Sequence, residues 1–155
     1  MLATDVDGVL TDAGMYYTEA GDELKKFNTR DGMGIKLLQK AGLITAIVTQ
    51  ENTKLVARRA AKLTIPELHQ GITDKLTCLH DMASRHGLTL QQIAYIGDDV
   101  NDLAALRAVG LSAAPADAMP GILRAVSYVC AKRGGEGAVR ELAELILEAQ
   151  GHGWA

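Results

Sequence analysis

Apolar and polar residues alternate along this chain in two patterns, one typical of buried strands and one typical of amphipathic helices. Short apolar, β-branched runs at residues 43–49 ("LITAIVT") and 92–97 ("QIAYIG") predict buried strands. Weaker runs at residues 110–115 and 126–130 predict two more. Between the strands, apolar residues recur at helical spacing, and several of these segments end in glycine, which often follows a helix. The helical segments are residues 31–42, 52–63, 74–87, 102–110 and 138–151.

One segment breaks this rhythm directly after a short first strand at the N-terminus. Residues 14–28 ("GMYYTEAGDELKKFN") alternate with a two-residue period around "EAGD", which predicts a β-hairpin. Because the domain is small, the apolar side chains of this hairpin have little of it to cover. We therefore expect them to contact another subunit. A hairpin folded back on its own sheet is the alternative. These apolar residues are Met15, Tyr17, Leu24 and Phe27.

Strands that alternate with helices predict parallel βαβ units. The expected fold class is therefore α/β, a Rossmann-like three-layer sandwich with a mainly parallel sheet and a β-hairpin inserted after strand 1. The sequence contains no repeat, low-complexity tract or linker. We therefore expect a single domain over residues 1–155, with the hairpin as a flap at about residues 13–29.

Composition narrows the partners that this domain can have. The chain has 155 residues, of which 48% are apolar, so it can bury a substantial core. A net charge of −3 argues against nucleic acid or an anionic membrane as the main partner. The apolar runs are too short to span a bilayer and no signal peptide is evident, so we expect a cytoplasmic protein. Cys78 and Cys130 lack a second ligand at metal-binding spacing, which favours reduced thiols in the core.

Polar residues fall where the predicted strands end or where helices begin. Asp5 and Asp7 follow the first strand, Thr49 follows the second, and Lys75 opens a helix. The segment "GDDVND" (residues 97–102) follows another strand. Ligands bind at the carboxyl ends of the strands in an open parallel sheet. These residues therefore predict one pocket that contains carboxylates, a hydroxyl and an ammonium.

Clustered carboxylates at strand ends suit a hard cation with oxygen ligands, and Mg²⁺ is the ordinary choice. Such an ion would supply the positive charge that Asp5 and Asp7 lack, and its open positions suit a phosphate ester. One carboxylate can attack phosphorus to form an aspartyl-phosphate, and the other can protonate the leaving oxygen and later activate water. Thr49 would bind the phosphoryl oxygens, and Lys75 would offset the charge on the transferring group.

These residues resemble the four motifs of the haloacid dehalogenase-like phosphatases, in the same order. The matching segments are "DVDGVLTD" (residues 5–12), Thr49, Lys75 and "GDDVND". The order excludes a response-regulator receiver domain, in which an acidic pair precedes a phospho-accepting aspartate on a later strand. In this chain the DxD motif comes first and the GDD motif comes late.

Further segments resemble the capless subclass of that family, which dephosphorylates 3-deoxy-2-keto sugar acids. Its members include the 3-deoxy-manno-octulosonate 8-phosphate phosphatases and the nonulosonate (KDN, N-acylneuraminate) 9-phosphate phosphatases. The resemblance implies a homotetramer in which the hairpins associate and neighbouring subunits close each active site. The matching segments are "FNTRDGMGIKLL", "QGITDK", "IAYIGDDVNDL" and "KRGGEGAVRE".

The resemblance also implies a role for each motif residue. Asp5 would be the nucleophile and Asp7 the acid/base. The Asp5 carboxylate, the Asp7 carbonyl oxygen and Asp98 would bind Mg²⁺. Asp99 and Asp102 would orient the catalytic lysine and its loop.

The family contacts its substrate at a second set of positions. Arg30 and Arg59 suit a sugar-acid carboxylate because a planar guanidinium can grip it with two hydrogen bonds. Surface charge is the alternative for Arg59, and also for Lys36. The complete set is Asn28, Thr29, Arg30, Asp31, Gly32, Lys36, Glu51 and Arg59.

One position departs from the octulosonate pattern. Those enzymes usually read Thr-Gly-Arg after the motif threonine, whereas this chain reads "TQEN", with Glu51 in place of the arginine. A carboxylate there would repel a substrate carboxylate and favour a hydroxyl or amine. A glutamate followed eight residues later by Arg59 is similar to the nonulosonate enzymes. The eight-carbon and nine-carbon substrates therefore both stay open.

The sequence thus predicts a Mg²⁺-dependent phosphomonoesterase that acts on a phosphorylated 3-deoxy-2-ulosonic acid. One alternative is a catalytically silent tetramerisation module of the same fold, although every motif residue is intact in this chain. Another is a phosphatase for a different small sugar phosphate. A phosphomutase or phosphotransferase would need to keep water from the aspartyl-phosphate, and a hairpin of this size is a thin lid.

Overall fold

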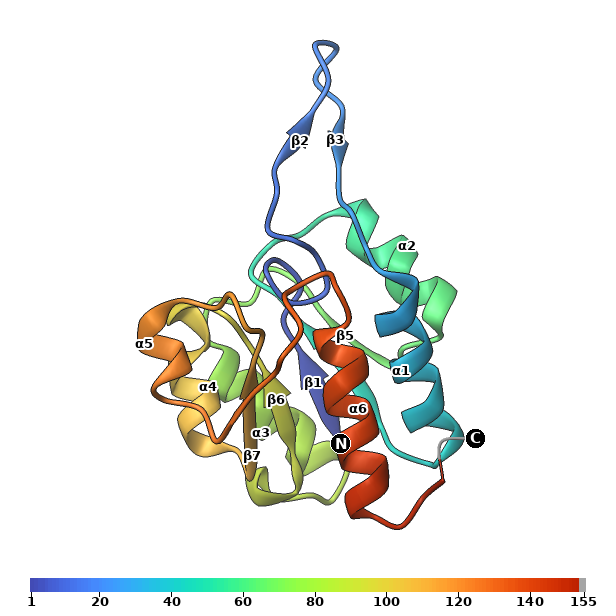
Figure 1. The fold of residues 1–155 in the computed structure, drawn as a ribbon, viewed down its shortest axis with the longest axis vertical. Helices are drawn as coiled ribbons and strands as arrows, with labels where there is room; N and C mark the ends of the chain where they lie inside the picture. The colour runs from blue at the N-terminus through green and yellow to red at the C-terminus, as the bar shows by residue number, and fades with distance from the viewer. Residues whose placement is uncertain (154–155) are drawn as a thin grey trace.

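A parallel sheet forms the centre of the computed structural model, which describes residues 1–153 (Figure 1). Within those residues the sheet has six strands in the order β5-β4-β1-β6-β7-β8, and every neighbouring pair is parallel. The mainly parallel α/β sandwich predicted from the sequence is therefore confirmed. The strands are β1 (Leu2–Thr4), β4 (Thr45–Val48), β5 (Glu67–His69), β6 (Ala94–Ile96), β7 (Leu111–Ala114) and β8 (Tyr128–Val129).

The register of the central strands brings their carboxyl ends to one edge. Leu2 of β1 pairs with Thr45 of β4 on one side and with Ala94 of β6 on the other. All three strands are buried along their length, as expected for a parallel sheet covered on both faces. The residues that follow them therefore emerge side by side.

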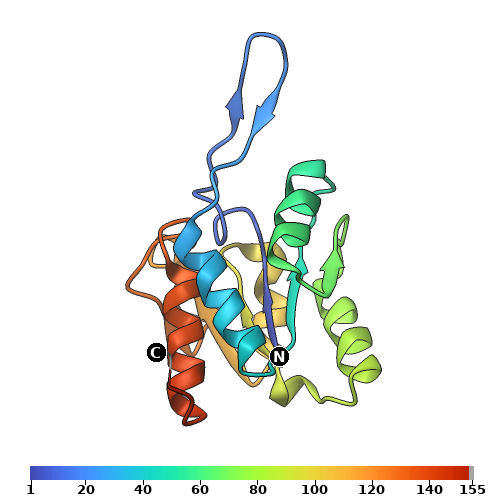
Figure 2. The same cartoon turned by 90° about the vertical axis from the view of Figure 1, so that its right-hand side faces the viewer.

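Helices cover both faces of the sheet and complete the three layers. Leu38 and Leu142, from α1 and α6, pack in one buried cluster, whereas Leu79 and Leu106, from α3 and α4, pack in the other. Figure 2 shows α1 and α6 side by side on one face and α3 on the other. The helices are α1 (Thr29–Lys40), α2 (Lys54–Leu63), α3 (Lys75–Arg85), α4 (Leu103–Ala108), α5 (Pro120–Leu123) and α6 (Ala138–Ala149), with 3₁₀ turns η1 (Leu90–Gln92) and η2 (Val100–Asp102).

Side-chain caps fix the first residues of three helices. Asn28, Thr53 and Asp74 each accept a hydrogen bond from a backbone N–H in the first turn of α1, α2 and α3. Such caps satisfy N–H groups that have no partner inside the helix. As a result Lys75 begins α3 at the edge of the sheet where the strands end.

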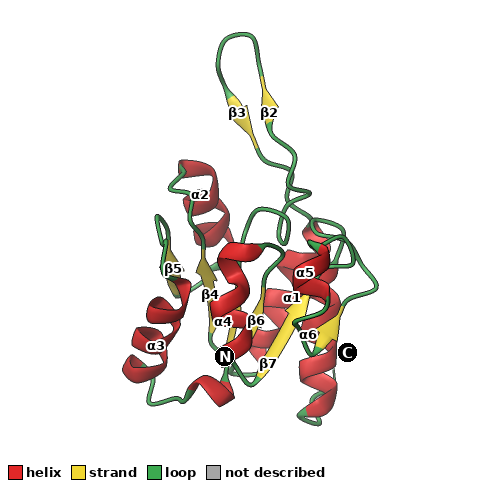
Figure 3. Ribbon diagram, turned by 90° about the vertical axis from the view of Figure 1, so that its left-hand side faces the viewer, coloured by secondary structure: helices red, strands yellow, loops and turns green. Residues whose placement is uncertain are grey.

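The hairpin forms a separate two-stranded sheet, β2 (Tyr16–Tyr17) and β3 (Glu23–Leu24), that projects from the body (Figure 3). A bridge between Thr11 and Phe27 closes its base. The alternative of a hairpin folded back on the main sheet is therefore wrong. Tyr17 is 64% exposed and Leu24 55% exposed, so the apolar faces of the projecting part are free in this single chain.

Phe27 corrects one expectation about the hairpin. Its ring packs against the main core of its own chain, and the Arg59 guanidinium lies 5.6 Å from the ring centroid. It therefore belongs to the body and is not part of the exposed apolar face.

Within residues 1–153, no helix is both long enough and apolar enough to cross a bilayer.

Candidate active site

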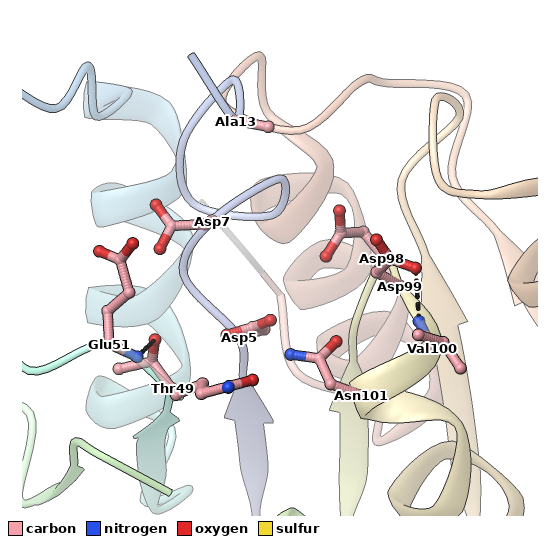
Figure 4. Close-up of a pocket in the computed structure, with 10 residues that line it drawn as sticks. Asp5, Asp7, Ala13, Thr49, Glu51, Asp98, Asp99, Val100 and Asn101 are labelled. Atoms are coloured by element: carbon pink, nitrogen blue, oxygen red, sulfur yellow. Dashed lines mark hydrogen bonds between the residues drawn. The ribbon is translucent and has the colours of Figure 1, made fainter. Parts of the chain in front are cut away.

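A cavity of about 660 Å³ opens at the carboxyl ends of β1, β4 and β6. Figure 4 shows Asp5 in the centre of this cavity, with Asp7 and Glu51 on one side and Asp98 and Asp99 on the other. The sequence predicted Asp5, Asp7, Asp98 and Asp99 in one pocket because they follow neighbouring parallel strands, whereas Glu51 was predicted only as a substrate contact. The Lys75 ammonium, which was also predicted for this pocket, does not line it. The other residues that line the cavity are Ala13, Thr49, Gln50, Val100 and Asn101.

An ion-pair chain lies beneath the cavity. The Lys75 ammonium is 2.7 Å from Asp5 Oδ2 and 2.6 Å from Asp102 Oδ1. The three side chains are at most 7% exposed, so water screens these charges little. The Val6 N–H donates to the other oxygen of Asp5, Oδ1, at 2.7 Å, so both oxygens of this carboxylate are held in place.

Asp102 accepts hydrogen bonds on both of its oxygens. Besides Lys75, the Tyr95 hydroxyl donates to Oδ1 at 2.5 Å. The backbone N–H groups of Asp98 and Asp99 donate to Oδ2 at 3.0 Å and 3.3 Å. The carboxylate therefore ties the loop after β6 to the lysine of α3.

Asp99 has a more local role in this structure. Its Oδ1 accepts a hydrogen bond from the backbone N–H of Val100 at 2.6 Å and so caps the 3₁₀ turn η2. The resemblance assigned Asp99 and Asp102 together to the orientation of Lys75 and the loop. Asp102 contacts the lysine directly, whereas Asp99 shapes the loop.

Two carboxyl groups of the cavity, those of Asp5 and Asp98, have raised pKa values, which a bound cation would lower. Burial, and next the Asp102 charge, raise the pKa of Asp5 to about 7, although Lys75 opposes the shift. Burial and then the charges of Asp5, Asp102 and Asp99 raise the pKa of Asp98 to about 7. A divalent ion bound between these carboxylates would stabilise their charged forms.

The donor set fits a hard metal ion. Asp5, Asp98 and Asp102 each place an oxygen within 4.8 Å of the other two. Because Lys75, Tyr95 and two backbone N–H groups already occupy Asp102, Asp5 and Asp98 are the better ligands. An all-oxygen set suits Mg²⁺.

Gly8 allows the Asp98 carboxylate to approach the loop after β1. Its φ is +77°, and a Cβ atom at this position would lie 2.0 Å from Asp98 Oδ2. Any side chain would therefore be strained in the backbone and would displace the carboxylate. This close approach explains why a glycine follows the two aspartates.

Sequence reasoning missed one cation of this site, Lys25, which follows β3 at the stem of the hairpin. Its Nζ lies 2.6 Å from Asp7 Oδ1 and 2.8 Å from Glu51 Oε2, and its side chain is 2% exposed. Burial opposes the charged form, but the two carboxylates outweigh it and raise the pKa of Lys25. The sequence around Lys25 contains no pattern that predicts such a contact.

Most of the predicted substrate-contact residues lie outside the cavity lining in this single chain. Asn28 caps α1, where its Oδ1 accepts from the Arg30 N–H at 2.8 Å. Thr29 and Arg30 are exposed in the first turn of that helix. The Lys36 ammonium donates to Thr64 Oγ1 at the end of α2. Glu51 is the member of the set that lines the cavity.

Asp31, Gly32 and Arg59 lie at a junction between helices, where Asp31 and Gly32 are buried and Arg59 is partly buried. Asp31 is fully buried, and its Oδ1 accepts a hydrogen bond from the Arg140 N–H at the start of α6. Burial raises its pKa. Arg59 donates to the carbonyl oxygen of Asn28 at 2.8 Å and passes over Gly32, where a Cβ would lie 2.6 Å from Nη2. In this chain these residues hold α1 against α2 and α6.

The sequence of this chain is similar to those of known phosphatases. Residues 50–142 match the family model of the haloacid dehalogenase-like hydrolases. The chain is 45% identical to the 3-deoxy-D-manno-octulosonate 8-phosphate phosphatase of Yersinia pestis, over 97% of this chain and 80% of that protein.

Two solved structures have the same fold. One is the Moraxella catarrhalis 3-deoxy-D-manno-octulosonate 8-phosphate phosphatase in complex with magnesium, phosphate and a KDO molecule. It matches with a TM-score of 0.94 and 41% identity, over 97% of this chain and 86% of that one. The cobalt-bound Haemophilus influenzae phosphatase matches with a TM-score of 0.92 and 43% identity, over 97% and 88% of the two chains. This chain therefore belongs to the haloacid dehalogenase-like hydrolases, and it is a phosphoric monoester hydrolase.

Proposed function

We propose that this chain is a Mg²⁺-dependent phosphatase whose substrate is 3-deoxy-D-manno-octulosonate 8-phosphate. The observation that carries the proposal is the Asp5 carboxylate, which faces the cavity at the end of the central strand while Lys75 holds one of its oxygens. The name of the Yersinia relative supports this substrate, and so do the ligands of the Moraxella structure.

The first half of the reaction transfers the phosphoryl group to the protein. The Asp5 carboxylate attacks phosphorus, and the bond between phosphorus and the sugar oxygen breaks. The Asp7 carboxyl group gives its proton to that leaving oxygen, so the sugar acid departs as a neutral alcohol at this position. The Thr49 hydroxyl, which lines the cavity, would donate a hydrogen bond to a phosphoryl oxygen.

The second half regenerates the protein. Water attacks phosphorus of the aspartyl-phosphate, the Asp7 carboxylate takes the proton from that water, and inorganic phosphate leaves Asp5. Lys75 holds the orientation of Asp5 through both steps. Asp5 and Asp98, with the Asp7 carbonyl oxygen, would hold Mg²⁺, which when bound offsets the negative charge of the phosphoryl group.

A nonulosonate 9-phosphate is the second candidate substrate. Glu51 favours it, because this carboxylate lies in the cavity where the octulosonate enzymes usually have an arginine. The Lys25 ammonium lies 2.8 Å from Glu51, however, and offsets its charge. This ion pair removes much of the repulsion expected between Glu51 and a substrate carboxylate, so the octulosonate stays the first candidate.

We also propose that the working form is a homotetramer, in which hairpins from neighbouring subunits cover one another. The exposed apolar residues of the hairpin support this proposal. Arg30 is exposed in the first turn of α1, three residues after Phe27, whose bridge to Thr11 closes the base of the hairpin. A neighbouring subunit that packs on the hairpin would therefore lie near Arg30 and complete the substrate site there.

The proposed function is tested by phosphate release with Mg²⁺ from the two substrates in parallel, at equal concentrations. We expect faster release from the octulosonate ester. Asp5→Asn abolishes release because the nucleophile is lost, and a chelator abolishes it in the unchanged protein. Asp81→Asn, an exposed position on α3, is the matched control and keeps the activity.

Faster release from the nonulosonate ester would make Glu51 the determinant of specificity. The nonulosonate would then become the first candidate substrate and the octulosonate the second. Absence of release from both esters, from folded protein that binds Mg²⁺, would refute the substrate class and favour the silent tetramerisation module.

A further inference from the structure

We propose that Lys25 is a positioning residue for the acid/base group Asp7, so that the stem of the hairpin is a working part of the active site. This inference rests on the proposed function, because it assigns Asp7 the transfer of a proton to the leaving oxygen. None of the four sequence motifs contains Lys25.

The contacts of Lys25 set it apart from Lys26, the other lysine of the hairpin. Its Nζ lies within ion-pair distance of three carboxylates, at 2.6 Å from Asp7, 2.8 Å from Glu51 and 3.9 Å from Glu23. The side chain is 2% exposed, whereas that of the next residue, Lys26, is 58% exposed. The chain therefore directs one lysine of this pair into the site and the other into solvent.

Lys25 also resolves a conflict of charge within the cavity. The carboxylates of Asp7 and Glu51 lie on the same side of it (Figure 4). Two negative groups this close repel each other unless a cation lies between them. The Lys25 ammonium contacts both, so its removal would leave two partly buried carboxylates without a counter-ion.

The contact restrains one oxygen of Asp7 and leaves the other available. Oδ1 accepts the hydrogen bond from Lys25 at 2.6 Å and a longer one from Thr11 Oγ1 at 3.4 Å. The Asp7 side chain is 34% exposed, so little packing fixes its orientation. With Oδ1 held, Oδ2 can carry the proton that the leaving oxygen receives. Correct orientation of a general acid is a large part of its contribution to the rate.

The hairpin supplies this restraint through its stem. Lys25 follows β3, and the Thr11–Phe27 bridge fixes the stem to the body two residues later. The position of the ammonium therefore depends on the position of the stem. Any contact that moves the hairpin also moves the partner of Asp7.

The test compares two phosphate esters that differ in their need for an acid. An aryl phosphate such as p-nitrophenyl phosphate has a leaving group that departs without a proton, whereas a sugar phosphate needs one. The ratio kcat/KM covers only the steps up to the first departure of the leaving group. Hydrolysis of the aspartyl-phosphate therefore does not enter the comparison.

We expect Lys25→Met to lower kcat/KM for the sugar phosphate by about tenfold or more, and for the aryl phosphate by less than about threefold. Lys25→Arg, which keeps the charge, restores most of the loss. Lys26→Met is the matched control and leaves both values unchanged. Equal losses on the two esters would mean a purely structural role, and no loss on either would also refute the proposal.

A second measurement needs no activity. In thermal unfolding, Lys25→Met combined with Asp7→Asn is expected to lower Tm by less than the sum of the two single changes, because both remove the same ion pair. Additive shifts would contradict the contact. If the protein releases phosphate from the aryl ester but from no sugar-acid phosphate, the proposed function is refuted and the proposal for Lys25 is not. The Lys25 variants would then be compared on the aryl ester and on another alkyl phosphate that the protein hydrolyses.

Discussion

At the scale of single residues, Asp102 controls the geometry of the site although it lies outside the cavity lining. It receives hydrogen bonds from Lys75, from Tyr95 and from two backbone N–H groups, and it is fully buried. A buried carboxylate of this kind is stable only while its donors are present. Its donors are equally dependent on it, because Lys75 is also buried.

This dependence predicts a large difference between two substitutions. Asp102→Ala leaves the Lys75 ammonium buried beside a cavity with one counter-ion, and we expect a loss of about 3–5 kcal/mol in the free energy of unfolding. Tyr95→Phe removes one of several donors and is expected to cost about 1 kcal/mol. Urea unfolding of the three proteins measures both values. Similar losses for the two variants would contradict the central role of Asp102.

The site residues differ in how well the sequence predicts them. Asp5, Thr49 and Asp98 follow adjacent strands of a parallel sheet, so local pattern and topology together bring them to one edge. Lys25 was missed because its contacts depend on how the hairpin leaves the body, and no local pattern encodes that direction. Lys36 was expected near the substrate, but in this single chain its ammonium is bonded to Thr64.

At the scale of elements, the sequence predicts long helices better than short edge elements. Helices α1, α3 and α6 begin and end within two residues of the expected ranges, because their apolar periodicity is regular. The strand β5 was missed, since "ELH" is short, partly exposed and without an apolar run. It is held by backbone pairing with β4, which sequence periodicity does not report.

Glu67 on β5 fastens this edge strand to the end of α3. Its carboxylate lies 2.6 Å from His86 Nε2, 2.7 Å from His69 Nε2 and 2.8 Å from Arg85 Nη2. Partial burial raises the pKa of Glu67, but these three contacts outweigh it and lower the pKa from 4.5 to about 2. The folded state therefore binds fewer protons than the unfolded state between these two values.

This shift predicts a pH-dependent contribution to stability. The contribution of Glu67 is fully present above pH 4.5 and is lost as the pH falls toward about 2. We expect Glu67→Gln to cost about 1 kcal/mol near neutral pH, and the difference from the unchanged protein to narrow in acid. Urea unfolding at a series of pH values measures it. Glu148→Gln, exposed near the end of α6, is the control, and a difference independent of pH would contradict the assignment.

At the scale of the whole molecule, the projecting hairpin carries several of the exposed large apolar side chains found in residues 1–153. Met15, Tyr17 and Leu24 are each more than half exposed on an element with no core of its own. A two-stranded hairpin of this length is marginally stable in water by itself. Contact with other copies would supply the missing burial.

We therefore expect Leu24→Glu to convert the proposed tetramer into smaller species, because it places a charge in an apolar interface. Size-exclusion chromatography with light scattering measures the mass. Glu19→Lys near the hairpin turn changes charge without changing the apolar face, and it serves as the control. A tetramer that survives Leu24→Glu, or an unchanged protein that is monomeric at micromolar concentration, would refute the proposed assembly.

The position of β1 at the centre of the sheet has a consequence for how the protein is made. Leu2 precedes its two partners, Thr45 and Ala94, in the chain and is therefore synthesised before either of them. Until β6 has been released, β1, the strand that precedes Asp5, has an open, apolar edge, and pairings this distant along the chain form slowly. Asp5 is thus synthesised before the two strands that fix its surroundings, and it reaches its final environment only when both have paired with β1.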